Sequence, residues 1–279
     1  MQMFAPNVLV VGDRIYELDD AVGRPNPAAA ASRYETEVVA LRQKIQAQPF
    51  GARWYDIVGN NKEPIVIVPT TATNQAVAQT FENVKEKPNR LADSMARGFT
   101  DPSINAAIGP GTGAGTPIRV KFNTAATVGS MAGAASGEVL LMHELTHAYR
   151  SAGGRFTPIP MAGLVNPDRL KGNPDLARRF PDWEEWFAVV VENVFAAETG
   201  KPILRAHWDL LFPATATSPA YFKFWNIPTV GTKTDSEEFA EDYRPAVLRI
   251  PSVESALFHA MAASSAWFNP VRDLLFSRK

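Results

Sequence analysis

The sequence predicts an α+β fold, with a small mixed β-sheet and a largely helical C-terminal part. Short apolar runs flanked by glycine or proline occur within the first 122 residues, and such runs are typical of strands. Longer segments with helical periodicity, bounded by capping residues and glycines, follow from about residue 138. Hydrophobic residues make up 46% of the 279 positions, so the chain can form a sizeable core.

The first 50 residues are expected to form an N-terminal extension to a main domain that spans residues 51–279. The segment "VLVVGDRIYEL" (residues 8–18) predicts a hairpin that turns at Gly12 and Asp13. Asn26 and Pro27 then begin a helix that runs to about Gln48. The extension is therefore predicted to be a hairpin followed by a helix.

Two further strands are predicted before the main helices. "PIVIVPT" (residues 64–70) is wholly apolar and bounded by prolines, which indicates a buried strand, whereas "IRVKF" (residues 118–122) alternates and indicates a half-exposed one. The intervening "IGPGTGAGT" (residues 108–116) lacks the lysine of a phosphate-binding loop and precedes a strand, so we interpret it as a plain glycine loop.

Helices are predicted over residues 138–151 and 181–199, separated by a long loop over residues 155–180. Glycines follow both helices, and Pro181 begins the second. Two more helices are expected at residues 236–247 and 253–268.

Composition excludes several classes of site and partner. The chain has no cysteine, so a metal ion can be held only by His, Asp or Glu. A formal net charge of −1 gives no electrostatic basis for binding nucleic acid. No apolar stretch approaches the roughly 18–20 residues of a membrane span, and the N-terminus lacks the basic region of a cleaved signal peptide. Nothing in the sequence specifies an oligomeric state.

The segment "LLMHELTHAYR" (residues 140–150) contains the pattern HExxH. On a helix His143 and His147 share one face, so both imidazoles can bind one Zn²⁺ ion. Glu144 is rotated by about 100° from His143, which suits a general base acting on a zinc-bound water rather than a third ligand. The neighbouring residues are apolar enough to bury the helix, and buried polar side chains require a reason.

The third zinc ligand is expected from one of two acidic segments, "DWEEWFAVVVEN" (residues 182–193) or "DSEEFAEDYR" (residues 235–244). The first is apolar nearly all round, so a carboxylate on it calls for a metal or a cation. The second is dense in charge and typical of a solvated helix face. We therefore favour Glu185, with Glu237 and Glu184 as alternatives.

The segments "HELTHAYR" and "EEWFAVVVENVFAAETGKPILR" resemble the NleD-like family of bacterial effector zinc metallopeptidases. The resemblance extends over about residues 104–205 and implies a zincin-like fold, with HExxH and a downstream glutamate as zinc ligands. "EEWFA" is similar to the stretch in which lethal-factor-like zincins place that glutamate, which supports Glu185, although "EEFAE" preserves the same pattern.

The resemblance implies a zinc endopeptidase that cleaves proteins inside a target cell. Such an effector or toxin is secreted without a cleaved signal peptide; otherwise the protein is expected in the cytoplasm. Two alternatives remain, a housekeeping zinc peptidase acting on small peptides and a non-catalytic, zinc-stabilised binding module. In a zincin-like fold we expect "IRVKF" at the sheet edge over the active site, where an extended peptide can pair with it.

Stabilisation of the oxyanion requires a donor in addition to zinc. We assign this role to Arg205 and His207, which follow the second helix; a salt bridge from Arg205 to Glu192 is the alternative. Tyr149 and Tyr243 are weaker candidates. Glu192 and Asn193 are better placed to orient a ligand imidazole, and His259, in an apolar helix, is expected in the core.

Overall fold

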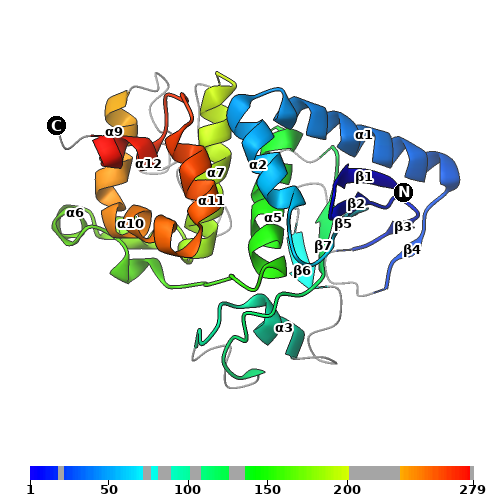
Figure 1. Cartoon of the computed structure of the whole chain (residues 1–279), viewed down its shortest axis with the longest axis horizontal. Helices are drawn as coiled ribbons and strands as arrows, with labels where there is room; N and C mark the ends of the chain where they lie inside the picture. Colours follow the sequence, from blue (N-terminus) through cyan, green and yellow to red (C-terminus); the bar gives the residue numbers. More distant parts are fainter. Residues whose placement is uncertain are drawn as a thin grey trace, which may run out of the picture. The chain divides into compact units, whose positions relative to one another are not determined.

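The computed structural model covers the chain and describes residues 1–17, 22–71, 77–80, 89–100, 108–125, 136–200 and 233–276 (Figure 1). The chain forms two compact units. The first comprises residues 1–47, 51–130 and 135–157, and the second comprises residues 48–50, 131–134 and 158–279. The described elements confirm an α+β fold with a small mixed sheet.

The first unit contains a five-stranded mixed sheet. Its strand order is β1 (Gln2–Ala5), β2 (Val8–Val10), β5 (Ile65–Pro69), β7 (Ile118–Phe122) and β6 (Val77–Thr80). The three inner strands are parallel to one another, and the two outer strands are antiparallel to their neighbours. The apolar runs predicted at residues 64–70 and 118–122 are confirmed as strands.

The expectation that "IRVKF" is a half-exposed edge strand is wrong. β7 lies between β5 and β6, and all five of its residues are buried. Its two cations are covered by the N-terminal segment: the Arg119 guanidinium lies 4.3 Å from the centre of the Tyr16 ring, and Lys121 Nζ donates a hydrogen bond of 2.9 Å to the Glu17 carbonyl. Burial lowers the pKa of Arg119.

The predicted hairpin over residues 8–18 is also wrong. β2 pairs with β1 and β5, while β3 (Arg14–Ile15) pairs with β4 (Arg24–Pro25). Gly12 instead lies against a helix: its N–H donates to Glu35 Oε1 at 3.0 Å, and a side chain on it would meet the backbone of Ala31. Close packing, rather than a tight turn, explains this glycine.

Helices of the first unit cover the sheet. α5 (Gly137–Ala152) packs against β5, β6 and β7, and α1 (Ala28–Gln46) packs against α5 and β1 (Figure 1). Both confirm predicted helices. The sequence did not predict β6, α3 (Asn89–Ser94) or α2 (Pro49–Gly59). Most of α2, from residue 51 on, belongs to this unit.

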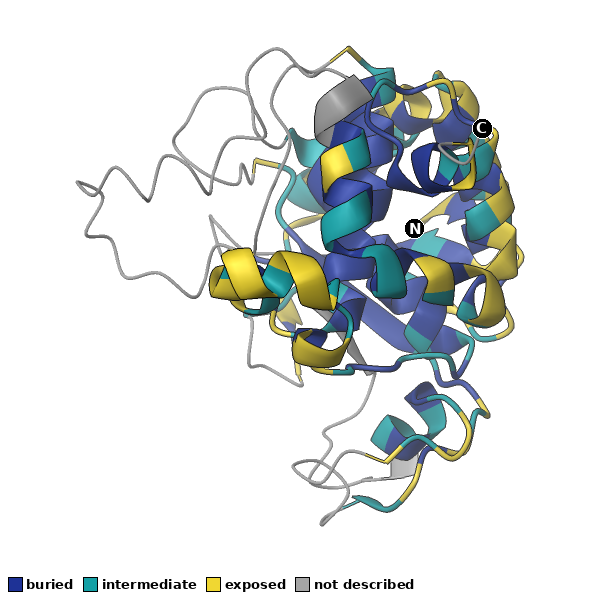
Figure 2. Ribbon diagram, turned by 90° about the vertical axis from the view of Figure 1, so that its left-hand side faces the viewer, coloured by how far each residue is buried: buried dark blue, intermediate teal, exposed yellow. Residues whose placement is uncertain are grey.

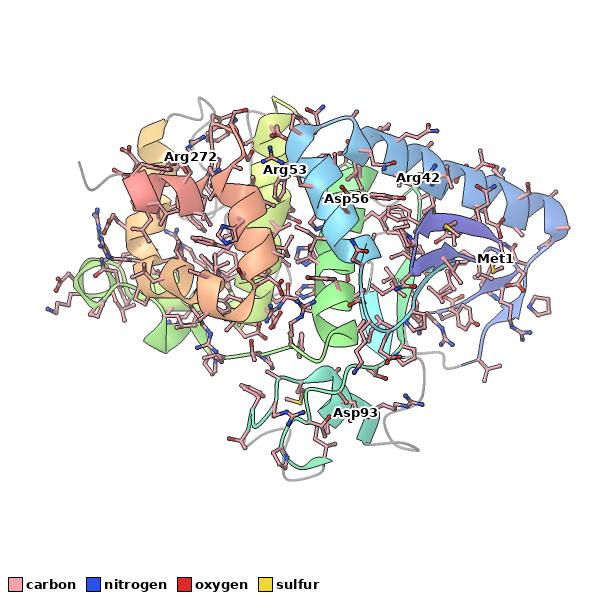
Figure 3. All side chains as sticks on the ribbon, in the orientation of Figure 1. Met1, Arg42, Arg53, Asp56, Asp93 and Arg272 are labelled. Atoms are coloured by element: carbon pink, nitrogen blue, oxygen red, sulfur yellow. The ribbon has the colours of Figure 1, made fainter. Side chains whose placement is uncertain are left out.

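The glycine loop is held by hydrogen bonds from its backbone N–H groups to the carbonyls of residues 92–99. The N–H groups of residues 111, 112, 113 and 115 donate to the carbonyls of residues 99, 92, 95 and 93, and the Thr112 hydroxyl bonds to the Asp93 carboxylate at 2.7 Å (Asp93 is labelled in Figure 3). These donors are therefore engaged, as expected of a structural loop and not of a phosphate-binding one. The loop packs against the end of α5, where a Cβ on Gly154 would lie 2.5 Å from the carbonyl carbon of Gly113.

The second unit is helical in its described residues. It consists of η1 (Met161–Gly163), α6 (Pro167–Gly172), η2 (Pro174–Arg178), α7 (Trp183–Glu198), α9 (Lys233–Asp242), α10 (Arg244–Val253), α11 (Ser255–Ala262) and α12 (Pro270–Phe276). The loop predicted over residues 155–180 thus contains three short helical turns. α7 confirms the helix predicted over residues 181–199 and buries nearly all of its residues. In contrast, α6 exposes most of its own residues (Figure 2).

Aromatic rings form the core of the second unit. Trp183 stacks on Phe187 with ring centres 4.9 Å apart, and Trp186 is parallel to Phe239 at 6.3 Å. The Trp183 indole N–H also donates to the Ala246 carbonyl at 3.3 Å. These contacts join α7 to α9 and α10. None of the helices among the described residues has the length and hydropathy needed to span a membrane.

Candidate metal centre

α5 carries the HExxH pattern in a buried environment. Every residue from Val139 to Arg150 is buried, and the helix is flanked by the N-cap Ser136 and the C-cap Gly153. The side chains of the pattern are buried with it: His143 is 3% exposed, and Glu144 and His147 are each 8% exposed. Polar side chains are costly to bury unless they form hydrogen bonds, ion pairs or bonds to a metal, so these three side chains require polar partners.

The two imidazoles converge as expected for ligands of one ion. The Nε2 atoms of His143 and His147 lie 3.1 Å apart, and the ring centres are 4.7 Å apart at an angle of 79°. Two nitrogens bound to one tetrahedral zinc at about 2.0–2.1 Å are separated by about 3.3 Å. The geometry of the pair therefore fits two histidine ligands of a single zinc ion.

α5 is held in place by contacts that the sequence analysis missed. The Thr146 hydroxyl, inside the HExxH pattern, accepts a hydrogen bond of 3.2 Å from the Trp54 indole N–H of α2 and donates one of 2.8 Å to the Met142 carbonyl. At the end of the helix, the buried Arg150 donates to the Arg155 carbonyl at 2.5 Å and to the Thr157 hydroxyl at 3.3 Å. Both contacts fix the position of the helix that carries the histidines.

The acidic residues proposed as third ligands lie on two helices. Glu184 and Glu185 occupy the first turn of α7, and Glu237 lies on α9. Asp182 is the N-cap of α7, and its Oδ1 accepts a hydrogen bond of 3.0 Å from the Glu185 N–H. Glu184 is 1% exposed, whereas Glu185 and Glu237 are partly buried.

Among the described residues, one group of side chains has the composition and spacing to hold a metal ion: His143, His147 and Glu185. One ligand atom of each lies within 4.8 Å of those of the other two. Glu184, Glu237 and Glu144 are not members of the group. Two imidazole nitrogens and one carboxylate oxygen form a donor set that zinc commonly adopts in catalytic sites, with a fourth position left for water.

The residues proposed to stabilise an oxyanion have different outcomes. Arg205 and His207 lie outside the described residues. The Tyr243 hydroxyl donates to the Leu176 carbonyl at 3.0 Å inside the second unit, and burial raises its pKa, so Tyr243 has a structural role. Tyr149 is 5% exposed, with the Arg155 guanidinium 4.1 Å from its ring centre.

Three other predicted roles concern residues of the helical unit. Glu192 and Asn193 are both 1% exposed on α7, and their proposed role in orienting an imidazole stays a prediction. The expectation that His259 lies in the core is wrong, because it is on the exposed face of α11. Its apolar neighbours in the sequence, such as Leu257 and Met261, point into the core from other faces of this helix.

Comparison with known proteins gives no relative: no protein-family model matches the chain, and no curated protein or solved structure matches it either. The function is therefore inferred from the geometry and chemistry of the site.

Proposed function

We propose that the protein is a zinc-dependent endopeptidase of zincin type that hydrolyses peptide bonds of protein substrates. The observation that carries the proposal is the group of His143, His147 and Glu185, in which the two Nε2 atoms are 3.1 Å apart. Glu144 lies next to His143 in the same turn of the buried α5. This arrangement combines three candidate ligands with a neighbouring carboxylate, which suits metal-assisted hydrolysis.

The roles of the residues follow from their chemistry. His143 and His147 would bind zinc through Nε2 and Glu185 through a carboxylate oxygen. When bound, zinc would supply a water with a pKa of about 7 and polarise the substrate carbonyl. Glu144 would accept a proton from that water and later donate it to the departing amine. Arg205 and His207 remain the residues proposed to stabilise the oxyanion.

The sheet suggests where an extended substrate would bind. The β1 edge is occupied by side chains: Arg42 donates to the Met3 carbonyl at 3.0 Å and Tyr55 to the Phe4 carbonyl at 2.5 Å (Arg42 is labelled in Figure 3). At the opposite edge, β6 pairs with β7 in the described part of the chain. We therefore propose β6, rather than β7, as the strand to which a peptide would add.

The NleD-like resemblance supports a protein substrate inside a target cell, and with it secretion as an effector or toxin. If the protein is instead a housekeeping peptidase in the cytoplasm, the same residues would act on short peptides. If it is a zinc-stabilised binding module, the ligands would serve structure alone. The three proposals predict different results in one set of experiments.

The test compares Glu144→Gln with Glu138→Gln, the same substitution on the same helix outside the HExxH pattern. Glu138 is in the first turn of α5, where its carboxylate lies 3.9 Å from Lys44. Each variant is loaded with zinc, its metal content is measured, and new N-termini are mapped after incubation with bacterial and host cell lysates. We expect Glu144→Gln to retain zinc and to lose at least 100-fold in hydrolysis, while Glu138→Gln retains both.

The alternatives are distinguished by the outcome. Dipeptides are assayed beside the lysates. Cleavage of dipeptides but not of intact proteins would indicate an enzyme that acts on small peptides. Bound zinc with no hydrolysis of any substrate by the wild-type protein would indicate a binding module. Absence of stoichiometric zinc in the wild-type protein would overturn the metal centre itself.

A further inference from the structure

The first turn of α7 contains both Glu185 and the residue that caps the helix. Asp182 has an extended backbone (φ −155°, ψ −179°), and its Oδ1 accepts a hydrogen bond of 3.0 Å from the Glu185 N–H. The first N–H groups of a helix have no partner within the helix, so this turn depends on such a cap. The amide that Asp182 holds belongs to the residue whose carboxylate joins the two histidines.

The entry to α7 is fixed at a second point. Asp182 forms an isolated antiparallel bridge with Pro160, and the Trp183 N–H donates to the Ile159 carbonyl at 2.8 Å. The Trp183 indole is itself anchored on the Ala246 carbonyl. The backbone on the N-terminal side of Glu185 is therefore held independently of the cap. In contrast, the cap bond acts directly on the Glu185 amide.

We propose that Asp182 is a positioning residue of the metal centre: its cap bond fixes the backbone of Glu185 and so directs the Glu185 carboxylate to the ion. This inference rests on the proposed function, in which Glu185 is a ligand. A ligand on a frayed turn must be ordered when the metal binds, and the lost conformational freedom weakens binding. Partners that orient metal ligands typically contribute 10–100-fold to metal affinity.

The test measures zinc affinity by competition with a chromogenic chelator in Asp182→Ala and Asp182→Asn. We expect Asp182→Ala to raise the Kd for zinc about tenfold. Asp182→Asn should change it by less than about threefold, because asparagine caps helices as well as aspartate does. If Asp182→Ala does not fold, Asp182→Gly removes the same acceptor at a smaller cost to the helix.

Asn166 provides a matched control. It is the N-cap of α6 in the same unit, and its side-chain oxygen accepts a hydrogen bond of 3.1 Å from the Asp168 N–H. Asn166→Ala thus removes a side-chain N-cap from a helix that carries no proposed ligand. We expect it to lower Tm, as loss of an N-cap does, and to leave the Kd for zinc unchanged.

Two results would overturn the inference. An unchanged Kd in Asp182→Ala would show that the cap contributes to stability alone. An equal loss of affinity in Asp182→Asn and Asp182→Ala would show that the negative charge matters rather than the cap. Glu185→Ala is measured in parallel. Zinc retained in Glu185→Ala would contradict the ligand assignment itself. Zinc lost in Glu185→Ala, together with an unchanged Kd in Asp182→Ala, would contradict this inference alone.

Discussion

Replacing Gly154 by alanine tests how the glycine loop supports α5. Gly154 has a φ of +64°, and a Cβ on it would lie 2.5 Å from the carbonyl carbon of Gly113 and 2.7 Å from the nitrogen of Gly115. The atoms met are backbone, so they cannot move aside as a flexible side chain would. A left-handed backbone costs an alanine about 1–2 kcal/mol, and overpacking costs about 1–3 kcal/mol. The free energy of unfolding should therefore fall by about 2–5 kcal/mol.

Gly98 separates the two contributions. It belongs to the same unit and has a φ of +73°, but a Cβ on it would meet no atom within 4 Å. Gly98→Ala should therefore lose only the backbone part, about 1–2 kcal/mol. Urea denaturation of the wild-type protein and both variants measures the difference. Equal losses in Gly154→Ala and Gly98→Ala would refute the close packing between the glycine loop and the end of α5.

The remaining predictions concern the ligand, the anchor of α5 and the effect of pH. Glu185→Ala should purify folded but largely free of zinc, whereas Glu237→Ala should keep zinc. If metal analysis shows the reverse, Glu237 and not Glu185 is the third ligand. Thr146→Val should lower the free energy of unfolding by about 1–3 kcal/mol, because the buried Trp54 indole loses its acceptor, and Thr146→Ser should retain most of the stability. Burial raises the pKa of Asp242 above its ordinary 3.8, so ionisation of this carboxyl destabilises the fold as pH rises through the raised value. Asp242→Asn should accordingly raise Tm at neutral pH and have no effect below the ordinary pKa; a gain that persists in acid would contradict this cause.

Local patterns in the sequence predicted the elements that carry the candidate site. Helical periodicity and terminal glycines located α5 and α7, because amphipathic or wholly apolar runs of that length have few other stable conformations. The i, i+4 spacing of His143 and His147 predicted their convergence, because it follows from helix geometry alone. The cap at Asp182 could also have been predicted, since aspartate is among the residues preferred at the N-cap and it directly precedes the apolar helical run.

Contacts between distant segments were not predictable in this way. Arg119 and Lys121 alternate with apolar residues as on an exposed edge strand, yet Tyr16 and Glu17 cover them. The contact between Thr146 and Trp54 joins residues 92 positions apart, and neither residue signals the other. Such pairs depend on which segments the chain brings together, and no local periodicity encodes that choice.

The sequence by itself determined which donor atoms this protein could offer to a metal ion: without cysteine they come from histidine and carboxylate, and HExxH on a helix supplies two imidazoles and a candidate base. Tertiary structure decided which carboxylate joins them. "DWEEWFA" and "DSEEFAE" have nearly the same local pattern, and Glu185 rather than Glu237 lies in the group with His143 and His147. The physical reason is that ligand identity follows from residue chemistry and helical spacing, whereas ligand selection depends on the packing of segments far apart in the chain.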